Sequence, residues 1–591
     1  MSSARQKENY EKAKKESDAI DEYIIKCLNE GRSVLVEAGA GSGKTYSLDR
    51  VIDWIQRNKW EDYKKKRQHV ACITFTNAAV DVIRRRLKNG SFIVPSTIHA
   101  FAWEAISQYQ STLQQIVSTE EIFETEHSDQ SDIKKVAYTL GHRYIEKGIY
   151  YLYHDDVLNL FSRLLDKPKF RRIFADKYPI ILIDEYQDSN RDIINQFIAY
   201  FISKKHGPQF AFFGDAWQTI YQSNKACGKI TDSNLETIKK PSNFRSAPRI
   251  VNFLNKLRPQ LPQLCAKDDC TGEIFVITSD NFHNDNRFDK GYCKGNLKPE
   301  VMQRCITEIS KKIKSNVPCS ETTKSLMITH KLLAAQQGYD ELLDILGDKF
   351  KEKEDPILQF VINILEPIYD ALSSSNSKRL FDVLGVKRYP IEKKSNKTAW
   401  KRLYMEFRTA RTKTLYDVFS TIRESRLVPI PPKLEELFAQ LKKSPDSLYT
   451  NNVTFYDFFN IPYRQFYAAV DFFKPDAGFS TEHGVKGEEY DNVIFVISKG
   501  WNLYQFEKYA PMIEKPSSVP VKELEAYERN RNLFYVCCSR PIKRLFIFVS
   551  IPLDNPFRNF LTRLVGVENI VSYKEFIEQY QLPSHPDSTS I

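Results

Sequence analysis

Short apolar runs alternate with longer mixed segments along the first 235 residues. These runs cover residues 33–38, 69–76, 178–185 and 209–215. Each has the length and continuous apolar character of a strand that is buried on both faces. The intervening segments include a helix predicted over residues 77–87, with Asn77 as its N-cap. This alternation predicts a parallel sheet with helices on both faces.

A second alternation follows at residues 272–278, 325–330, 492–498 and 544–550, which predicts a second α/β domain. Two long helix-like segments interrupt the pattern and are expected to be helical insertions. The predicted division is a first α/β domain over 1–103 and 175–235 with an insertion over 104–174, a second α/β domain over 236–349 and 471–555 with a reduced helical insertion over 350–470, and a C-terminal extension over 556–591.

The composition narrows the class of protein only slightly. The formal net charge of +11 permits a polyanionic partner, and the 13% of aromatic residues suits either stacking on single strands or ordinary core filling. The charged N-terminus lacks an apolar signal region and no run of 18 apolar residues occurs. None of the ten cysteines forms a C-x-x-C pair. We therefore expect a reduced, cytoplasmic protein without a membrane span.

The stretch "VEAGAGSGKTYSL" carries the first chemical signal. A strand leads into a glycine-rich loop and then into a helix, so backbone N–H groups and the helix N-terminus converge on one point. Lys44 is predicted to reach the β and γ phosphates of a nucleotide, and Thr45 to bind Mg²⁺. The predicted phosphate loop consists of Ala38, Gly39, Ala40, Gly41, Ser42, Gly43, Lys44 and Thr45. Ala38 stands where the common pattern has glycine.

Two adjacent acids, Asp184 and Glu185, end the third apolar run. Asp184 suits a carboxylate that binds the metal, and Glu185 could activate the attacking water. A helix N-cap is the alternative interpretation. Two buried acids are costly without a cation or a function, so the pair indicates hydrolysis of the nucleotide.

Six motifs occur in a fixed order: "AGAGSGKT", "DEYQDS", "GDAWQTIY", "NFRS", "TEHGVKGEEYDNVIFV" and "RNLFYVCCSRPIKRL". This set resembles the UvrD/Rep/PcrA-like superfamily 1 DNA helicases, in which alanine is common at the first loop position. The resemblance implies two RecA-like domains, ATP and Mg²⁺ as cofactors, and single-stranded or tailed DNA as the partner. It covers both α/β domains.

The same resemblance implies roles for residues around the nucleotide. Gln218 corresponds to the residue that senses the γ-phosphate, and Arg245 and Arg540 correspond to two arginine fingers. Phe244 is implied to stack on adenine, and Glu489 to contact the sugar. Guanidinium groups suit the charge that develops on a transferring phosphoryl group.

The DNA contacts implied by the resemblance lie at loop ends, where hydroxyl and amide groups can hold successive phosphates. They are Phe75, Thr76, Asn77, Thr97, His99, Tyr221, Thr481 and His483. Gln187 and Asp188 are implied to link the ATP cleft to the DNA track. One position departs from the family, because Ser223 stands where a stacking tryptophan is usual. Trp217 precedes the glutamine and is not its equivalent.

Two functions stay open. The leading hypothesis is an ATP-dependent translocase or helicase on single-stranded DNA with 3′-to-5′ polarity. The alternative is a DNA- or nucleotide-sensing subunit without robust unwinding. It would resemble the helicase-like subunits of two-protein anti-phage systems such as Gabija, whose partner is an OLD-type nuclease. The basic stretch 387–413 suits either duplex phosphates or a solvated helix with Trp400, Tyr404 and Phe407 as a core stripe.

Overall fold

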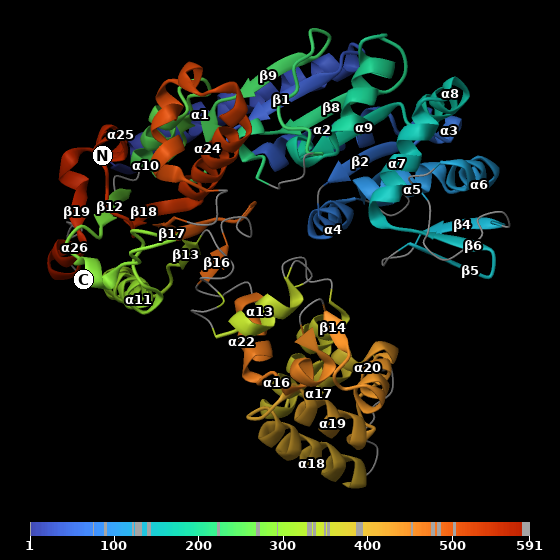
Figure 1. Ribbon diagram of the computed structural model, residues 1–591. Helices are drawn as coiled ribbons and strands as arrows, with labels where there is room; N and C mark the ends of the chain where they lie inside the picture. The colour runs from blue at the N-terminus through green and yellow to red at the C-terminus, as the bar shows by residue number, and fades with distance from the viewer. Residues whose placement is uncertain are drawn as a thin grey trace.

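The computed structural model contains two parallel sheets, each covered by helices on both faces, and a separate helical lobe (Figure 1). It describes residues 2–74, 76–87, 92–120, 123, 133–138, 143–220, 225–267, 272–291, 293–327, 334, 338–347, 350, 355–385, 394–450, 453–473, 479–481, 486–499 and 504–581.

The first sheet has the order β3-β2-β7-β8-β1-β9, and all neighbouring strands are parallel. Its strands are β1 (Val34–Ala38), β2 (Val70–Thr74), β3 (Ile93–Thr97), β7 (Ile180–Asp184), β8 (Gln209–Gly214) and β9 (Glu236–Lys240). Side chains alternate between two cores. Val34 and Val36 pack with the helices α1 (Ser2–Asn29) and α2 (Lys44–Asn58), whereas Leu35 faces the opposite core.

The second sheet has the order β16-β13-β17-β18-β12-β19 and is also parallel throughout. Its strands are β12 (Glu273–Thr278), β13 (Thr323–Met327), β16 (Phe479–Thr481), β17 (Tyr490–Ile497), β18 (Pro541–Val549) and β19 (Ile570–Ser572). One face is covered by α10 (Pro248–Leu257), α24 (Leu524–Cys538) and α25 (Asn555–Val565), and the other by α11 (Pro299–Asn316) and α26 (Tyr573–Gln579).

All eight apolar runs predicted as strands are strands, so the predicted fold class is confirmed. The runs were recognisable because central strands of parallel sheets are apolar on both faces. Most of the described cysteines are buried.

The insertion over 104–174 is not wholly helical, which corrects the prediction. Helices α6 (Gln110–Thr119) and α7 (His154–Leu165) flank a three-stranded sheet of β4 (Lys135–Tyr138), β5 (Tyr144–Glu146) and β6 (Ile149–Leu152). Lys147 and Gly148 join β5 to β6 with positive φ angles of 52° and 76°, which is typical of a two-residue hairpin turn. The short strands lack the long apolar runs on which the prediction depended.

The sheets also place some segments differently from the predicted boundaries. Strand β9 pairs with β1 and so belongs to the first sheet, although the boundary was predicted at residue 235. Strand β19 pairs with β12, so the predicted C-terminal extension completes the second sheet. Strand β9 alternates exposed and buried positions instead of being apolar throughout, and β19 has only three residues, so neither forms an apolar run that a local sequence pattern could reveal. The remaining division into domains stays a prediction.

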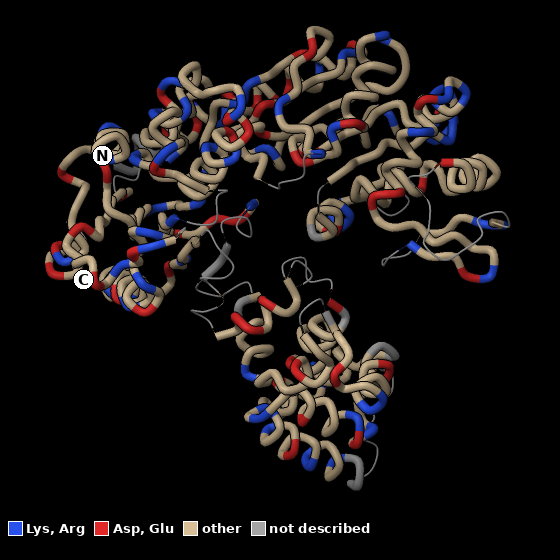
Figure 2. The backbone as a smooth tube through the Cα atoms, in the orientation of Figure 1, with Lys and Arg blue, Asp and Glu red and all other residues tan. Residues whose placement is uncertain are grey.

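The helical lobe has its own core, which begins at Ala334 and includes α13 (Asp340–Leu346), before the predicted start at residue 350. Its helix α18 (Lys394–Ala410) contains most of the predicted basic stretch. Trp400 and Phe407 are 3% and 0% exposed and pack into that core. Trp400 and Phe407 are therefore core residues, whereas Tyr404 is half-buried. Binding of duplex DNA by the exposed lysines and arginines of this helix stays a prediction (Figure 2).

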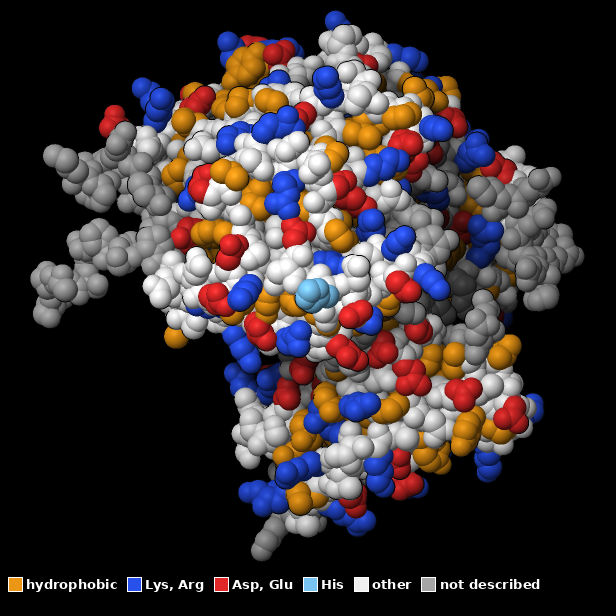
Figure 3. Space-filling model, turned by 60° about the vertical axis from the view of Figure 1, so that its left-hand side comes forward, with side chains coloured by type: hydrophobic (Ala, Val, Ile, Leu, Met, Phe, Trp, Pro, Cys, Tyr) orange, Lys and Arg blue, Asp and Glu red, His pale blue; other side chains and the backbone are white. Residues whose placement is uncertain are grey.

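Charged side chains of both signs are mixed over the face of the molecule drawn in Figure 3. The excess of basic residues is therefore not gathered into one patch on that face, and net charge alone does not locate a partner there.

A buried ion pair attaches α1 to the end of β9. Asp21 and Lys240 are both fully buried, and Lys240 Nζ lies 2.9 Å from Asp21 Oδ1. We predict that Asp21→Ala lowers the free energy of unfolding by about 3–5 kcal/mol, because it leaves a buried cation without its partner. Glu22→Ala removes the exposed neighbouring acid as a control. Urea denaturation measures the effect, and equal midpoints for the two variants would contradict it.

Candidate active site

The loop between β1 and α2 has a backbone that only glycine adopts readily. Gly41 and Gly43 have φ angles of 74° and 78°. A Cβ on Gly41 would come 2.8 Å from Asn243 Oδ1, so that position has no room for a larger residue. Ala38 ends β1 and packs into the core beneath α2, which explains why a methyl group is accepted at the first loop position.

Lys44 begins α2 and faces two acids, Asp184 at the end of β7 and Glu185 directly after it. Its ammonium forms an ion pair with Glu185 and lies 3.7 Å from Asp184 Oδ1. Burial raises the pKa of Asp184 to about 6, although Lys44 opposes this shift. Glu185 has a φ of 50°, a strained conformation of the kind found at functional sites. Two buried carboxylates therefore share one nearby ammonium, and a further cation would balance their charge.

Thr45 and Asp184 suit the predicted Mg²⁺. Thr45 lines the cavity beside Lys44, and Asp184 lies at the end of β7. Hydroxyl and carboxylate oxygens are the ligands that Mg²⁺ prefers, together with water and phosphate oxygens. Within the described ranges, no group of three His, Cys, Asp or Glu residues could hold a metal by itself. The donor atoms present thus fit a Mg²⁺ that is shared with a nucleotide.

A hydrogen bond joins Gln218, which follows β8 of the first sheet, to Arg540, which precedes β18 of the second sheet. Gln218 Nε2 donates to Asp215 Oδ2 at 2.9 Å, and Arg540 Nη2 donates to Gln218 Oε1 at 3.2 Å. Arg540 is 1% exposed, and burial together with nearby Arg245 lowers its pKa to about 9. Among the described residues, no carboxylate is within ion-pair distance of it. A buried guanidinium without an anion is costly, so this position favours a phosphate.

Arg245 and Phe244 approach the loop from the second domain. Arg245 Nε donates to Glu489 Oε2 at 2.8 Å, and its Nη1 donates to Ser539 O at 3.1 Å. The Phe244 ring lies 3.7 Å from the position of a Cβ on Gly43, and Tyr10 of α1 meets its edge at 6.1 Å. Glu489, the predicted sugar contact, is the ion-pair partner of Arg245 here.

One cavity of about 370 Å³ brings these residues together. Every predicted ATP-binding residue lines it, and so does every predicted catalytic residue except Asp184, which lies behind Lys44. The lining residues are Ala38, Gly39, Ala40, Gly41, Ser42, Gly43, Lys44, Thr45, Glu185, Gln218, Phe244, Arg245, Lys267, Gly487, Glu489, Arg540 and Ile542. Residues from seven separate stretches of sequence therefore share one cavity between the sheets.

Several residues at this cavity were not predicted. Asn243 Nδ2 and Gln263 Nε2 both donate to Ala40 O, at 3.1 and 3.0 Å, and the Ala40 N–H donates to the Tyr535 hydroxyl at 3.3 Å. Asn243 is the first residue of the motif "NFRS", so its position in the sequence could have indicated a role at the phosphate loop. Gln263 lies in no recognised motif. These bonds hold the phosphate loop directly against the second domain.

A second link joins the cavity to the segment after Glu185. Lys486 forms an ion pair with Asp188 and donates to Gln218 O at 2.6 Å. Gln187 Nε2 donates to Glu185 Oε2 at 2.6 Å, and its Oε1 accepts from the Asp215 N–H at 3.1 Å. Gln187 and Asp188, implied to couple the cleft to DNA, thus contact the residues around Gln218.

The predicted DNA contacts are only partly described. Thr76 follows β2 and caps α4 (Asn77–Arg86), so the predicted cap, Asn77, is instead the first residue of that helix. Thr97 ends β3 and caps α5 (Ile98–Ile106). Both helices begin at the carboxyl edge of the first sheet, as the phosphate loop does. Phe75, Tyr221 and His483 lie outside the described residues, as does Ser223, and of Thr481 only its place at the end of β16 is described.

His99, another predicted DNA contact, also packs against a neighbouring side chain. Its ring stacks on His154 with centroids 3.5 Å apart. Burial and that neighbouring histidine lower the pKa of His99 to about 4. His99 Nε2 is buried without a hydrogen-bond partner among the described residues, so a phosphate contact stays a prediction.

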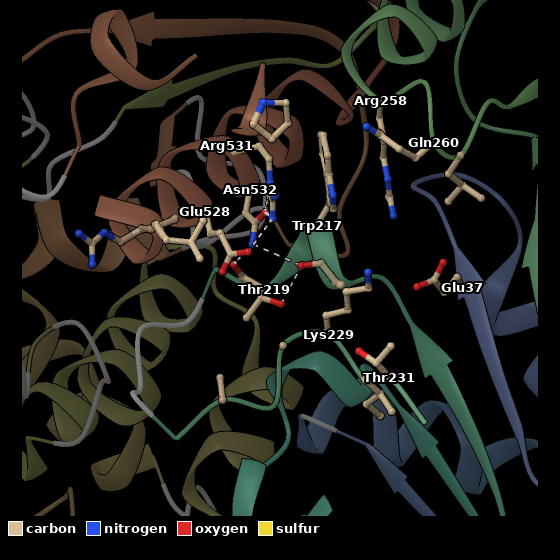
Figure 4. Close-up of a pocket in the computed structure, with 18 of the residues that line it drawn as sticks. Glu37, Trp217, Thr219, Lys229, Thr231, Arg258, Gln260, Glu528, Arg531 and Asn532 are labelled. Carbon is tan, nitrogen blue, oxygen red and sulfur yellow. Dashed lines mark hydrogen bonds and ion pairs between the residues drawn. The ribbon is translucent and has the colours of Figure 1, made fainter. Parts of the chain in front are cut away.

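A larger cavity of about 1290 Å³ lies between the β1–β9 edge and α24 (Figure 4). Trp217, Arg258, Arg531 and Asn532 line it. The loop 216–219 is the wall that this cavity shares with the smaller one, because Gln218 faces the other side. No role had been predicted for this region.

Comparisons with known proteins agree with the geometry. An AAA domain family model matches residues 21–224. The chain is 23% identical to Gabija protein GajB of Bacillus cereus (strain HuB5-5), over 90% of this chain and 95% of that protein. It is 25% identical to ATP-dependent DNA helicase Rep of Escherichia coli (strain K12), over 39% of this chain and 42% of Rep.

The matched relatives, which include proteins named ATP-dependent DNA helicases, support the expected likeness to the UvrD/Rep-like superfamily 1 helicases. The alignment with Rep spans about two fifths of Rep's length. Pif1 helicase from Candida albicans aligns over 92% of this chain and 98% of that chain at 11% identity, with a TM-score of 0.32.

The sequence predicts no membrane-spanning segment. Of the helices in the described parts of this UvrD/Rep-like chain, none has the length and apolar character needed to cross a bilayer.

The close fit of Gly41 yields a prediction. Gly41→Ala is expected to weaken binding of a fluorescent ATP analogue about tenfold or more, because the Cβ meets Asn243 and the backbone is strained. Gly31→Ala is the matched control, since Gly31 has a φ of 81° but nothing within 4 Å of a Cβ. The control should lose about 1 kcal/mol of stability without losing affinity. Equal affinities for Gly41→Ala and wild type would contradict the geometry.

Proposed function

We propose that the chain is an ATP-driven translocase on single-stranded DNA that unwinds duplexes with 3′-to-5′ polarity. One observation carries the proposal: the phosphate loop of the first domain and Arg540 of the second line the same cavity of about 370 Å³. A nucleotide there would be held from both sides, so hydrolysis would depend on how closely the two domains meet.

The lining residues support a division of labour in hydrolysis. Lys44 and Arg540 would neutralise the phosphates from opposite sides, and Arg245 would join them after leaving Glu489. Glu185 would orient the attacking water, since it already accepts from Gln187 and pairs with Lys44. Mg²⁺, held by Thr45 and Asp184, would polarise the phosphate oxygens.

The carboxyl edge of the first sheet suits a nucleic-acid track. Thr76 and Thr97 cap two helices there, and helix N-termini favour phosphates without reading bases. The ion pair between Asp188 and Lys486 would connect that edge to Gln218, because Lys486 also donates to the Gln218 carbonyl. The polarity rests on the family resemblance alone.

A sensing subunit is the second candidate. The similarity to Gabija protein GajB covers nearly the whole of both chains, whereas the alignment with Rep covers less than half of either. On this proposal the chain would act in anti-phage defence beside an OLD-type nuclease, and nucleotide or DNA binding would control that partner. Co-purification with such a nuclease tests the partner.

Strand displacement separates the two candidates. A translocase should release the strand of a 3′-tailed duplex faster than that of a 5′-tailed one, and only with ATP. A sensor should bind both duplexes without displacing either strand.

Lys44→Ala is predicted to abolish hydrolysis of ATP while leaving affinity for single-stranded DNA within about threefold, because Lys44 faces the phosphates and not the strand. Lys65→Ala is the matched control, since Lys65 is 76% exposed on a distant helix. Phosphate release and fluorescence anisotropy measure the two activities. DNA-stimulated hydrolysis at the wild-type rate in Lys44→Ala would overturn the site.

Arg540→Met is predicted to lower kcat by about 10³–10⁵-fold, as expected for an arginine finger. Its stability should change by no more than about 1 kcal/mol, because a buried cation without a carboxylate is removed. Arg544 offers the contrast: it is equally buried but lies 3.2 Å from Glu273 and 2.6 Å from Glu321.

Arg544→Met should therefore lose about 3–5 kcal/mol of stability without a direct effect on kcat. Thermal unfolding and steady-state hydrolysis of both variants test this pairing. The proposal would be wrong if Arg540→Met kept its kcat, or if Arg544→Met alone lost it while remaining folded.

A further inference from the structure

Trp217 lies in the loop after β8 with its ring between two guanidinium groups. Arg258 Cζ is 5.0 Å and Arg531 Cζ is 4.5 Å from the ring centroid, both within the range of cation–π attraction. Figure 4 shows the ring between these side chains. Tyr535 meets the ring edge-on at 5.6 Å. The ring belongs to the first domain, and its three partners lie on the side of the second.

The same loop is fixed on both sides of Gln218. Asn532 Nδ2 donates to Thr219 O at 3.0 Å and to Ala216 O at 3.3 Å. Arg531 in turn donates to Asn532 Oδ1 at 2.9 Å. Helix α24 therefore contacts the loop through the ring of Trp217 and through the carbonyls of Ala216 and Thr219. Gln218 lies between these contacts.

A chain of contacts leads from the ring to the proposed reaction centre. Arg258 Nη1 donates to Asp215 Oδ1 at 2.7 Å, and Asp215 Oδ2 accepts from Gln218 Nε2 at 2.9 Å. Gln218 Oε1 then accepts from Arg540. Trp217 itself lines the larger cavity and not the smaller one, so any effect on hydrolysis must pass through these neighbours.

The Trp217 ring lies between two guanidinium groups, which also contact the rings of Tyr535 and Tyr527, respectively. Arg258 has Asp215 as its partner, whereas the ion pair found for Arg531 among the described residues is the longer one with Glu528 Oε1, at 3.9 Å. Burial and the charge of Arg258 hold the pKa of Arg531 below its usual range. An indole presents a negative face to each cation. Without it, two cations would face each other beside a cavity of about 1290 Å³ and would separate.

We propose that Trp217 is a positioning residue, clamped by Arg258 and Arg531, through which α24 sets the place of Gln218 in the nucleotide cavity. This inference rests on the proposed ATP hydrolysis at that cavity. A packing residue of equal size would stabilise the interface but would not move kcat separately from nucleotide affinity.

Steady-state hydrolysis and binding of a fluorescent non-hydrolysable ATP analogue provide the test on the full chain. Trp217→Leu is expected to lower kcat about 10- to 100-fold, the loss typical of a misplaced catalytic group, with analogue affinity within about threefold. Trp217→Phe should recover part of the rate, because phenylalanine keeps a weaker ring face. Trp60→Leu is the matched control, since Trp60 carries one cation, Lys64 at 5.3 Å, and lines neither cavity.

Arg531→Met supplies the second arm. It should lower kcat to a similar extent, and the double variant Trp217→Leu with Arg531→Met should be no slower than the slower single variant, because both remove one clamp. Multiplying effects in the double variant would overturn the proposal. So would a kcat of Trp217→Leu within about twofold of the Trp60→Leu control.

Acrylamide quenching tests the clamp without hydrolysis. The difference between wild type and Trp217→Phe isolates the fluorescence of Trp217, which should be shielded and should become about twofold more quenched in Arg531→Met, because one face of the ring is uncovered. Unchanged quenching would overturn the clamp. Absence of hydrolysis in the wild type with the expected quenching would instead reject the proposed function and leave the clamp in place.

Discussion

The charge of Arg540 is the constraint on which the rest of the arrangement depends. Its guanidinium is almost fully buried, contacts Gln218 and has no carboxylate partner among the described residues. Lys44 on the opposite side of the cavity is already neutralised by Asp184 and Glu185. Among the described residues the guanidinium of Arg540 thus lacks an anionic partner, and in the proposed function a triphosphate would supply that charge in the place where both domains reach it.

Two parallel sheets explain how such distant residues meet. The carboxyl ends of parallel strands lie at one edge of a sheet, so the phosphate loop after β1, Asp184 after β7 and Gln218 after β8 converge without any direct sequence relation. The second domain then closes over that edge. Asn243, Gln263 and Tyr535 bind the backbone of Ala40, so the loop is held from the side of the domain that contributes the arginines.

Most strands and most residues of the nucleotide cavity could be predicted, because short local stretches of sequence identify them. The eight central strands are continuous apolar runs, and Lys44, Asp184, Gln218 and Arg540 lie in motifs of fixed order. The hairpin of β5 and β6, the pairing of β9 and the bonds of Gln263 could not be predicted, since short edge strands and single polar contacts depend on tertiary partners. Trp217 is the clearest case: the sequence showed an unplaced tryptophan, and its meaning lies in two arginines far along the chain.

In the proposed function, nucleotide hydrolysis at the interface of the two sheets is coupled to a DNA strand at the carboxyl edge of the first sheet. The decisive measurement is the rate of ATP hydrolysis as a function of single-stranded DNA concentration. We expect a rate that rises and saturates with the strand and that is lost without Mg²⁺. A measurable rate that does not change with the strand would rule out this coupling.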